Sequence, residues 1–499
     1  MSSAKEGRMK SQLSLRKQWP FWISGVFVGL AEVMHYVAFG KPIHLTTGLV
    51  QMTSALEQTL APGLDWWSRA YQPDVHWGII GIVLGAWLVT RMERESRSWR
   101  RYPNVNLWLA FWGGLVFSLG TRLADGCTTH HFLGGISSMS VASLIFVVSI
   151  LPAGFLTFYW MTKLGVGNAF KGQENRETAR YGYEHGGKMS LDGIAWDMSK
   201  DYKPGRNWLQ IGIIVFALLF FANAIVSSFL HDPLEGQAGW QHAIVNFGWG
   251  AAIWLISIGI IAGIGMAKTG FGTECAMMTP EISMGLKHDR KSGCSLFEGQ
   301  LRISGATRYM FGSMSPFTAI FIEFVILWVA IMIGWQIFGR ELPFQNTATW
   351  VMVLGALMQG FGSVAMIGCE IRTYMRLGLG YATAVAAFPG FLFGYLPYTL
   401  CAEWWEDLAS ATVITDVKSV PELFSQDATT QLLVALVYGA LLVLLVVWSV
   451  RRGMRLTGTS FKALATTSND ELSIDFFKRN FPEDQGSYSE HVKKEDVPA

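Results

Sequence analysis

Arginine, aspartate, cysteine and histidine occur close together in residues 120–135, which read GTRLADGCTTHHFLGG. This run continues an apolar stretch (106–119), and ionisable side chains at membrane depth usually mark a functional site. Residues 362–369, GSVAMIGC, repeat the spacing of a glycine, five residues and a Gly-Cys pair. Similar proline-containing runs follow, PAGFL at 152–156 and PGFL at 389–392. The chain is therefore predicted to use one cysteine-containing element twice.

Five cysteines occur in the chain, and their surroundings differ. Cys127, Cys275 and Cys369 lie in glycine-rich segments, where helices are expected to break. Non-helical backbone at membrane depth is tolerated only when it is buried in protein or lines a polar cavity, so these segments are candidate pore elements. Cys294 lies in a charged loop and Cys401 at a helix end, and we expect both to be dispensable.

Four short segments follow a predicted span but are too short to cross a membrane, and re-entrant half-helices fit them: 44–52, 128–137, 274–285 and 370–378. The broken N-termini of such helices expose unpaired amides and a partial positive charge, which suits a small anion. Arg122, Arg372 and Arg376 lie nearby. They would either add to that positive field or extend their charged ends to the membrane interface.

The composition is that of a membrane protein. Of the 499 residues, 51% are hydrophobic and 15% are charged, against about 25% charged in soluble domains. Apolar runs of roughly 18 to 25 residues predict ten membrane helices. Their approximate ranges are 20–39, 75–91, 106–124, 137–162, 208–230, 243–267, 314–338, 349–367, 379–401 and 431–450.

Basic residues gather in alternate connections, as the positive-inside rule requires of cytoplasmic loops. The N-terminal segment and residues 91–102 carry five each, whereas residues 231–242 contain no Lys or Arg. Both termini are therefore predicted to be cytoplasmic. Ten spans divide into two halves of five, and an odd number per half inserts the second copy upside down relative to the first.

The predicted fold is an all-α polytopic membrane protein, with about ten transmembrane helices plus re-entrant half-helices in an inverted 5+5 repeat. The expected segments are a cytoplasmic N-terminal segment (1–19), a first membrane repeat (20–230) with a cytoplasmic insertion (164–206), a second membrane repeat (243–450) with a cytoplasmic insertion (286–309), and a cytoplasmic tail (451–499).

Other polar residues within the spans leave two interpretations open. Glu32 and His35 share one face of the first predicted helix, as two metal ligands or a packed polar contact would. Glu323 in the seventh span fits either a proton-coupling acid or a hydrogen bond between helices. His130 and His131 can donate hydrogen bonds or bind a metal.

The element at 120–135 resembles the motif G-x-R-x-A-G-G-C-T-[S/T]-G-H-G-x-S-G of the YeeE/YedE sulfur-transport family, which includes bacterial thiosulfate-uptake permeases. The matching positions are Gly120, Arg122, Ala124, Gly126, Cys127, Thr128, His131 and Gly135. The segment TGFGTEC (269–275) and the element around Cys369 are similar to the family's other two cysteine elements, in the same order. The resemblance extends from the first span to about Tyr398.

The chain departs from the family pattern in both elements. Asp125, His130 and Phe132 stand where the family has glycine, and Val364 occupies the position that corresponds to Arg122 in the first element. A carboxylate at Asp125 would repel an anion unless Arg122 pairs with it.

The resemblance implies a channel-like permease of the bacterial cytoplasmic (inner) membrane, in which central cysteines pass a small sulfur-containing ion by S–H hydrogen bonds. A neutral thiol is a weak donor that can hold a soft sulfur atom without a buried charge. The candidate pathway residues are Cys127, Cys275, Cys369, Arg122, His131, Gly126, Gly368, Thr128, Glu274 and Arg372.

Two other functions fit the same residues. Cys, His and the Met-containing segment at 275–284 also suit a soft-metal (copper-type) transporter. A membrane thiol relay or enzyme that passes sulfur to a cytoplasmic partner would need a reactive cysteine with an adjacent base. We expect no enzymatic activity and no cofactor or resident metal. The expected partners are the lipid bilayer, a small sulfur-containing or selenium-containing ion and a cytoplasmic sulfur-handling protein, with no nucleic acid.

Overall fold

The computed structural model describes residues 19–61, 74–92, 104–164, 208–230, 248–269, 316–344, 346–366, 368–380, 382–457 and 460–466. These residues form helices, apart from a two-stranded antiparallel sheet of β1 (Ala348–Thr349) and β2 (Val413–Thr415). The all-α prediction is therefore confirmed for the described chain. Cys275, Glu274, Cys294 and the two cytoplasmic insertions lie outside the described residues.

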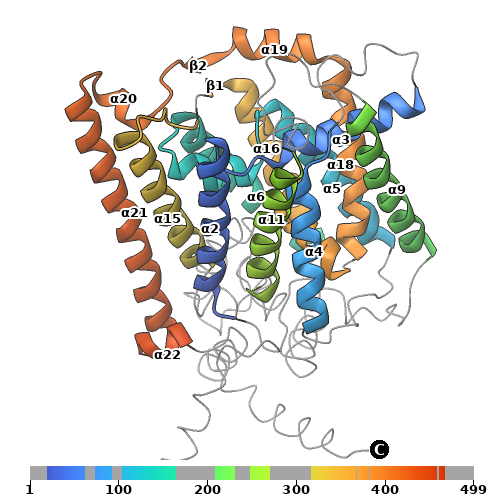
Figure 1. Ribbon diagram of the computed structural model, residues 1–499, viewed down its shortest axis with the longest axis horizontal. Helices are drawn as coiled ribbons and strands as arrows, with labels where there is room; N and C mark the ends of the chain where they lie inside the picture. The colour runs from blue at the N-terminus through green and yellow to red at the C-terminus, as the bar shows by residue number, and fades with distance from the viewer. Residues whose placement is uncertain are drawn as a thin grey trace, which may run out of the picture.

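A helix occupies each of the ten predicted ranges (Figure 1). These helices are α2 (Phe21–Phe39), α4 (Trp77–Met92), α5 (Asn104–Leu123), α6 (Val141–Leu164), α9 (Trp208–Leu230), α11 (Trp249–Thr269), α15 (Pro316–Gln336), α16 (Trp350–Ala365), α18 (Ala382–Leu400) and α21 (Ala428–Thr457). The last one continues into the predicted tail.

Length and composition support membrane crossing to different degrees. Among the described residues, five stretches are long and apolar enough: α2, α11, α15, α21 and Trp350–Leu379, which contains α16. A sixth arises if α18 and α19 (Ala402–Ala411), bent by 73°, form one span. The helices α4, α5, α6 and α9 contain shorter apolar stretches. The chain is thus a multi-pass membrane protein.

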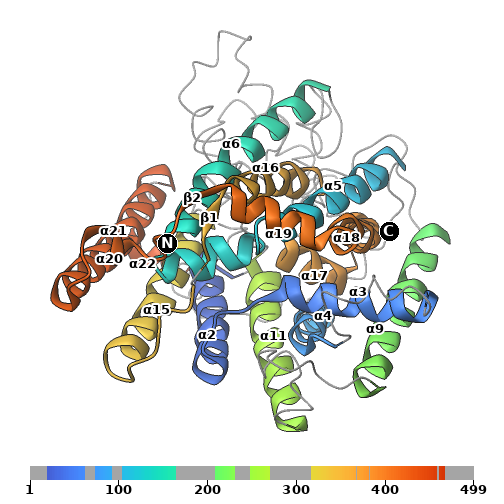
Figure 2. The ribbon, with the colours of Figure 1, turned by 90° about the horizontal axis from the view of Figure 1, so that it is seen from above.

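Eight of these ten helices form two rows of four, and the rows are visible from above (Figure 2). One row runs α15, α2, α11 and α4, and the other runs α6, α16, α5 and α18, each helix packing on the next. Two short elements that follow the glycine-rich breaks connect the rows: the π-helix η2 (Thr129–Gly135) contacts α6 and α15, and α17 (Glu370–Leu379) contacts α4 and α18. The region between the rows therefore contains both Gly-Cys elements.

Close glycine contacts show how α5 and α16 run past each other. A Cβ atom at Gly113 would meet the backbone near Gly362, and one at Gly120 would meet the carbonyl oxygen of Gly355. Because the higher number on one helix pairs with the lower number on the other, the two helices are antiparallel. Small residues allow the backbones to approach this closely inside a membrane.

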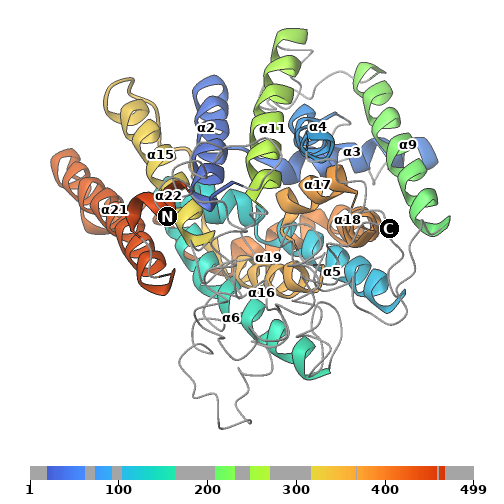
Figure 3. The same ribbon diagram turned by 90° about the horizontal axis from the view of Figure 1, so that it is seen from below.

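The helix ends agree with the alternating directions that the predicted topology requires. The amide of Trp19 donates to the carbonyl of Lys268 at 2.8 Å, and the indole of Trp22 donates to the carbonyl of Ala465 at 2.8 Å. The start of α2, the end of α11 and the short helix α22 (Phe461–Thr466) after α21 therefore lie on one face (Figures 1 and 3). The helix α19, the small sheet and α20 (Val420–Phe424) lie at the opposite end.

Candidate functional site

The two Gly-Cys elements share two backbone hydrogen bonds. The amide of Gly126 donates to the carbonyl five residues before it, on Thr121, at 2.8 Å, and Gly368 donates to Ser363 at 2.8 Å. The carbonyl of each cysteine then accepts from the amide four residues later, Cys127 from His131 and Cys369 from Thr373, both at 2.9 Å. Both copies of the sequence repeat therefore contain the same two hydrogen bonds.

Helices begin directly after both cysteines. The π-helix η2 follows Cys127 where a regular half-helix was predicted, and α17 matches the prediction and has Cys369 as its N-cap residue. A third helix, α3 (Leu45–Leu60), is longer than the predicted 44–52; residues 45–55 are buried, whereas Leu60 is exposed. The starts of three helices therefore lie near one another, and helix N-termini favour an anion.

Glu370, the first residue of α17, connects these helix starts. It is buried, and its carboxylate accepts from the Thr46 hydroxyl on α3 and from the Tyr374 hydroxyl, each at 2.8 Å. The Cys127 thiol also hydrogen-bonds with the Glu370 carboxyl. One carboxylate thus occupies donors from all three helix starts.

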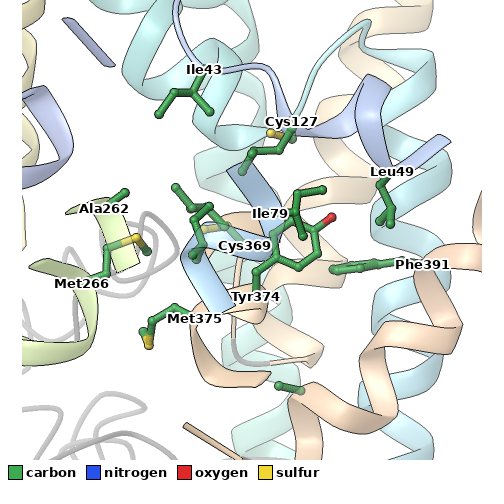
Figure 4. Close-up of a cluster of buried hydrophobic side chains, with 14 of the residues drawn as sticks. Ile43, Leu49, Ile79, Cys127, Ala262, Met266, Cys369, Tyr374, Met375 and Phe391 are labelled. Carbon is green, nitrogen blue, oxygen red and sulfur yellow. The ribbon is translucent and has the colours of Figure 1, made fainter. Parts of the chain in front are cut away.

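Both described cysteines of the repeat are fully buried in one cluster of apolar side chains. Figure 4 shows them together with Ile79 and Tyr374. Cys401, by contrast, is exposed at the bend between α18 and α19. The cysteines thus divide by context as the sequence predicts, although their roles in transport stay a prediction.

The three arginines predicted near the half-helices are all buried, so none extends to an exposed interface. Arg376 binds the backbone where α16 ends, donating to the Met366 carbonyl at 2.9 Å and to the Thr383 hydroxyl. Arg122 interacts electrostatically with Glu370 and lies over the ring of Tyr398, 5.9 Å from its centroid. Arg372 is buried on α17. Arg122 is therefore the cation best placed beside the site.

His131 stabilises the first break. Its Nε2 lies 2.8 Å from the Ala124 carbonyl and its Nδ1 lies 3.0 Å from the Ser143 hydroxyl, so the ring donates to the first and accepts from the second. Its ring also stacks on Phe146, with centroids 4.4 Å apart. Both ring nitrogens are engaged within the protein, which suits a residue that positions the break.

The remaining residues of the first element fit closely around the two imidazole rings. A Cβ atom at Gly126 would meet the rings of His130 and His131. His130 stacks on His44, with centroids 4.1 Å apart, and Thr128 is buried at the start of η2. Gly368, at the matching position of the second element, has more room. No group of three His, Cys, Asp or Glu side chains that would hold a metal occurs among the described residues.

Asp125 departs from the family glycine at a position that glycine favours. Its φ is 51°, in the left-handed region that aspartate tolerates better than most residues. Its exposed carboxylate accepts from the Asn346 side chain at 3.1 Å and interacts electrostatically with Arg122. The added carboxylate is therefore exposed, whereas the thiols of Cys127 and Cys369 are buried.

Thr46, Glu370 and Tyr374 were absent from the sequence-based candidates, although they surround Cys127. Position and chemistry together identify Glu370: it is an acid directly after a predicted pore cysteine, at the position that Thr128 occupies in the first element. Thr46 carries no comparable sequence pattern, because only the packing of α3 against α17 brings it to the carboxylate. Tyr374 lies four residues after Glu370 on the same helix and reaches the carboxylate locally.

The Glu32 and His35 pair is a packed polar contact. Glu32 accepts from the amide of Ile43 at 2.6 Å, and the Nδ1 of His35 lies 2.6 Å from the carbonyl of Lys41. Both partners belong to the connection between α2 and α3. The pair thus holds the start of α3 in place.

Comparison with known proteins agrees with this geometry. The sequence model of a family described as "Sulphur transport" matches residues 2–156 and 301–482. Two similar proteins from Xylella fastidiosa are each named "Probable transporter": one from strain Temecula1 is 33% identical and one from strain 9a5c is 28% identical. Each match spans 152 residues, 30% of this chain and 97% of the relative. The chain therefore belongs to the Sulphur transport family of membrane transporters.

Proposed function

We propose that the chain is a permease that takes up a small sulfur-containing anion such as thiosulfate across the bacterial cytoplasmic membrane, with both termini in the cytoplasm. The observation that carries this proposal is the meeting of two Gly-Cys breaks and three helix starts in one buried cluster. Helix starts favour an anion, and neutral thiols suit its soft sulfur atom. Family membership supports the sulfur chemistry.

An inverted repeat explains how the two elements share one pathway. A shift of 242 residues, the separation of Cys127 and Cys369, carries Gly113 onto Gly355 and Gly120 onto Gly362. The contact between Gly113 and Gly362 then becomes the contact between Gly355 and Gly120, which is also present. Exchange of contacts in this way is what a two-fold axis between the antiparallel helices α5 and α16 produces.

The pathway would work by exchange of hydrogen bonds. At rest, Glu370 occupies the Thr46, Tyr374 and Cys127 donors. An arriving anion would take over some of these donors, and the carboxylate would recover them when the anion leaves. Transport needs binding that is weak enough for release, and an internal competitor limits the affinity. Cys275 would continue this series of thiols, with Arg122, Arg372, Thr128 and Glu274 as further pathway residues.

Uptake of labelled thiosulfate into proteoliposomes tests the proposal. We expect Cys127→Ala and Cys369→Ala to lower uptake at least tenfold, and Cys401→Ala, the matched control at an exposed position, to leave it near normal. Cu(I) is the comparison substrate. Uptake of Cu(I) without thiosulfate, or equal behaviour of the three variants, would contradict the proposal.

One observation favours a second candidate, a thiol relay to a cytoplasmic sulfur-handling protein: the Cys127 thiol has a carboxyl group beside it. However, a carboxylate opposes formation of a thiolate next to it, so this neighbour suits a neutral, hydrogen-bonding thiol better than a nucleophile. Mass spectrometry of the purified protein after exposure to thiosulfate distinguishes the two candidates, because a relay would leave a persulfide on Cys127 or Cys369.

A further inference from the structure

Two acids are buried where α2 packs against α15, outside the cysteine cluster. Glu32 on α2 and Glu323 on α15 are both 0% exposed. One oxygen of Glu32 accepts from the Ile43 amide at 2.6 Å. Its second oxygen and both oxygens of Glu323 have no hydrogen-bond partner within the described part of the chain. The two carboxyl groups are close enough to interact electrostatically. This arrangement is costly unless it binds something.

The surroundings of the pair favour a proton as that ligand. Val28 and Ala31 on α2 and Ile320 and Phe324 on α15 are buried in the apolar core. A metal cation such as Ca²⁺ takes six or more oxygen ligands, whereas the pair offers three unpartnered oxygens. A proton needs only one oxygen, and it removes the repulsion between the acids.

Other titratable or charged groups on the neighbouring elements have partners elsewhere. On α2, His35 is held by the Lys41 carbonyl, and Arg340 lies over the Tyr36 ring. On α11, Lys268 lies over Trp19 at the start of α2. Tyr438 on α21 donates to the Ile136 carbonyl at 2.8 Å, and His131 on η2 is held by Ala124 and Ser143. Glu32 is thus the charged group that acts on Glu323.

We propose that Glu32 and Glu323 form a proton-binding site that couples proton movement to substrate movement through α3. The connection is a series of contacts. Glu32 accepts a hydrogen bond from the amide of Ile43, two residues before α3 begins. Thr46, in the first turn of α3, donates to Glu370. Glu370 in turn hydrogen-bonds with the Cys127 thiol.

Protonation changes this series at its first member. While Glu323 holds the proton, Glu32 is ionised and accepts from the Ile43 amide in a charge-assisted hydrogen bond. When the proton passes from Glu323 to Glu32, that bond becomes neutral and weaker, so the start of α3 can move and loosen the contact of Thr46 with Glu370. The proton returns to water on release, and no other reactant is needed.

This inference rests on the proposed function, and its test separates the two. Full-length protein in proteoliposomes is given labelled thiosulfate, with the membrane potential held at zero and a gradient of one pH unit, acidic on the side of substrate addition. One proton per substrate gives about tenfold accumulation. We expect Glu323→Gln to keep downhill uptake within about threefold of wild type but lose the accumulation. Glu341→Gln, at an exposed carboxylate, is the matched control.

Infrared spectroscopy of the purified protein provides a second measurement that does not depend on transport. A neutral carboxylic acid has a carbonyl band that ionised carboxylates lack, and we expect this band at pH 7 in the wild type and its loss in Glu323→Gln. If no thiosulfate enters, the proposed function fails while the band still tests the acid pair. Thiosulfate uptake unaffected by the pH gradient, accumulation driven by Na⁺ instead, or absence of the band would overturn the proton site.

Discussion

Replacement of Glu370 by glutamine tests whether an internal carboxylate competes with the substrate. The substitution preserves the size of a side chain that is 1% exposed but removes its charge. A unit charge about 4 Å from a bound anion is worth about 4 kcal/mol at an effective dielectric constant of about 20, which sets an upper limit on the gain in affinity. We expect thiosulfate to bind at least about tenfold more tightly, which corresponds to about 1.4 kcal/mol.

The same substitution should lower stability and the maximum transport rate. Two hydrogen bonds of 2.8 Å, donated by Thr46 and Tyr374, lose their charged acceptor. Hydrogen bonds to charged groups contribute about 1.5–3 kcal/mol and neutral ones about 0.5–1.5 kcal/mol, so the loss is about 2 kcal/mol for the two bonds. Tighter binding also slows release, so the maximum rate should fall.

Binding measured by calorimetry and initial uptake rates in proteoliposomes check the two effects separately. Tyr374→Phe is the matched control, because it removes one of the donors and leaves the Glu370 charge in place. It should lower stability without raising affinity. If Glu370→Gln weakens binding in proportion to the rate, the carboxylate is a substrate ligand or a structural residue, and the competition argument is wrong.

Three further predictions concern the breaks and the pathway. Gly113→Ala and Gly355→Ala should each cost about 1–3 kcal/mol in unfolding experiments, because each added methyl group meets the partner helix; a neutral effect at one position would contradict the two-fold relation. Gly126→Ala should abolish uptake, because the added methyl group would meet the rings of His130 and His131. Asp125→Gly should leave uptake near normal, because the backbone φ of 51° at this position suits glycine. A membrane-impermeant thiol reagent added outside should modify Cys127 before Cys369, and inside-out vesicles should reverse this order. Saturating thiosulfate should slow both reactions. Labelling of Cys127 only from the cytoplasmic side would refute the proposed pathway.

The sequence predicts the parts of the fold that depend on local composition. Apolar runs locate the ten helices, and the glycine and cysteine spacing locates both breaks, because membrane helices and their interruptions have strong local patterns. Boundaries are less exact: α3 extends eight residues beyond the predicted 52, since its second half is a mixed polar segment without an apolar run. The π-helical form of η2 was not predicted either.

The centre of the site could not be predicted in the same way. Cys127 and Cys369 are visible from the Gly-Cys repeat, but the contact of Thr46 with Glu370 joins residues 324 positions apart. His131 matches a family motif, yet the sequence does not show that both of its ring nitrogens bind inside the protein. Such roles follow from tertiary packing, which no local pattern specifies.

The two copies of the Gly-Cys element differ in charge in a complementary way. The first has Arg122 where the second has Val364, and the second has Glu370 where the first has Thr128. These two charges belong to different copies, and the packing of the helices brings them close enough to interact electrostatically. The opposite charges of Arg122 and Glu370 therefore offset each other, although each copy by itself carries one of them uncompensated.

A double-mutant cycle tests this complementarity. Arg122→Gln alone leaves Glu370 as a buried charge without this cation, and an uncompensated buried charge is destabilising. Arg122→Gln combined with Glu370→Gln removes both charges and should recover a large part of that loss. Chemical denaturation of the wild type, both single variants and the double variant gives the coupling energy, which we expect to be at least about 1 kcal/mol. Additive changes in the free energy of unfolding would mean that the two charges act independently. The two copies would then not compensate each other's charge.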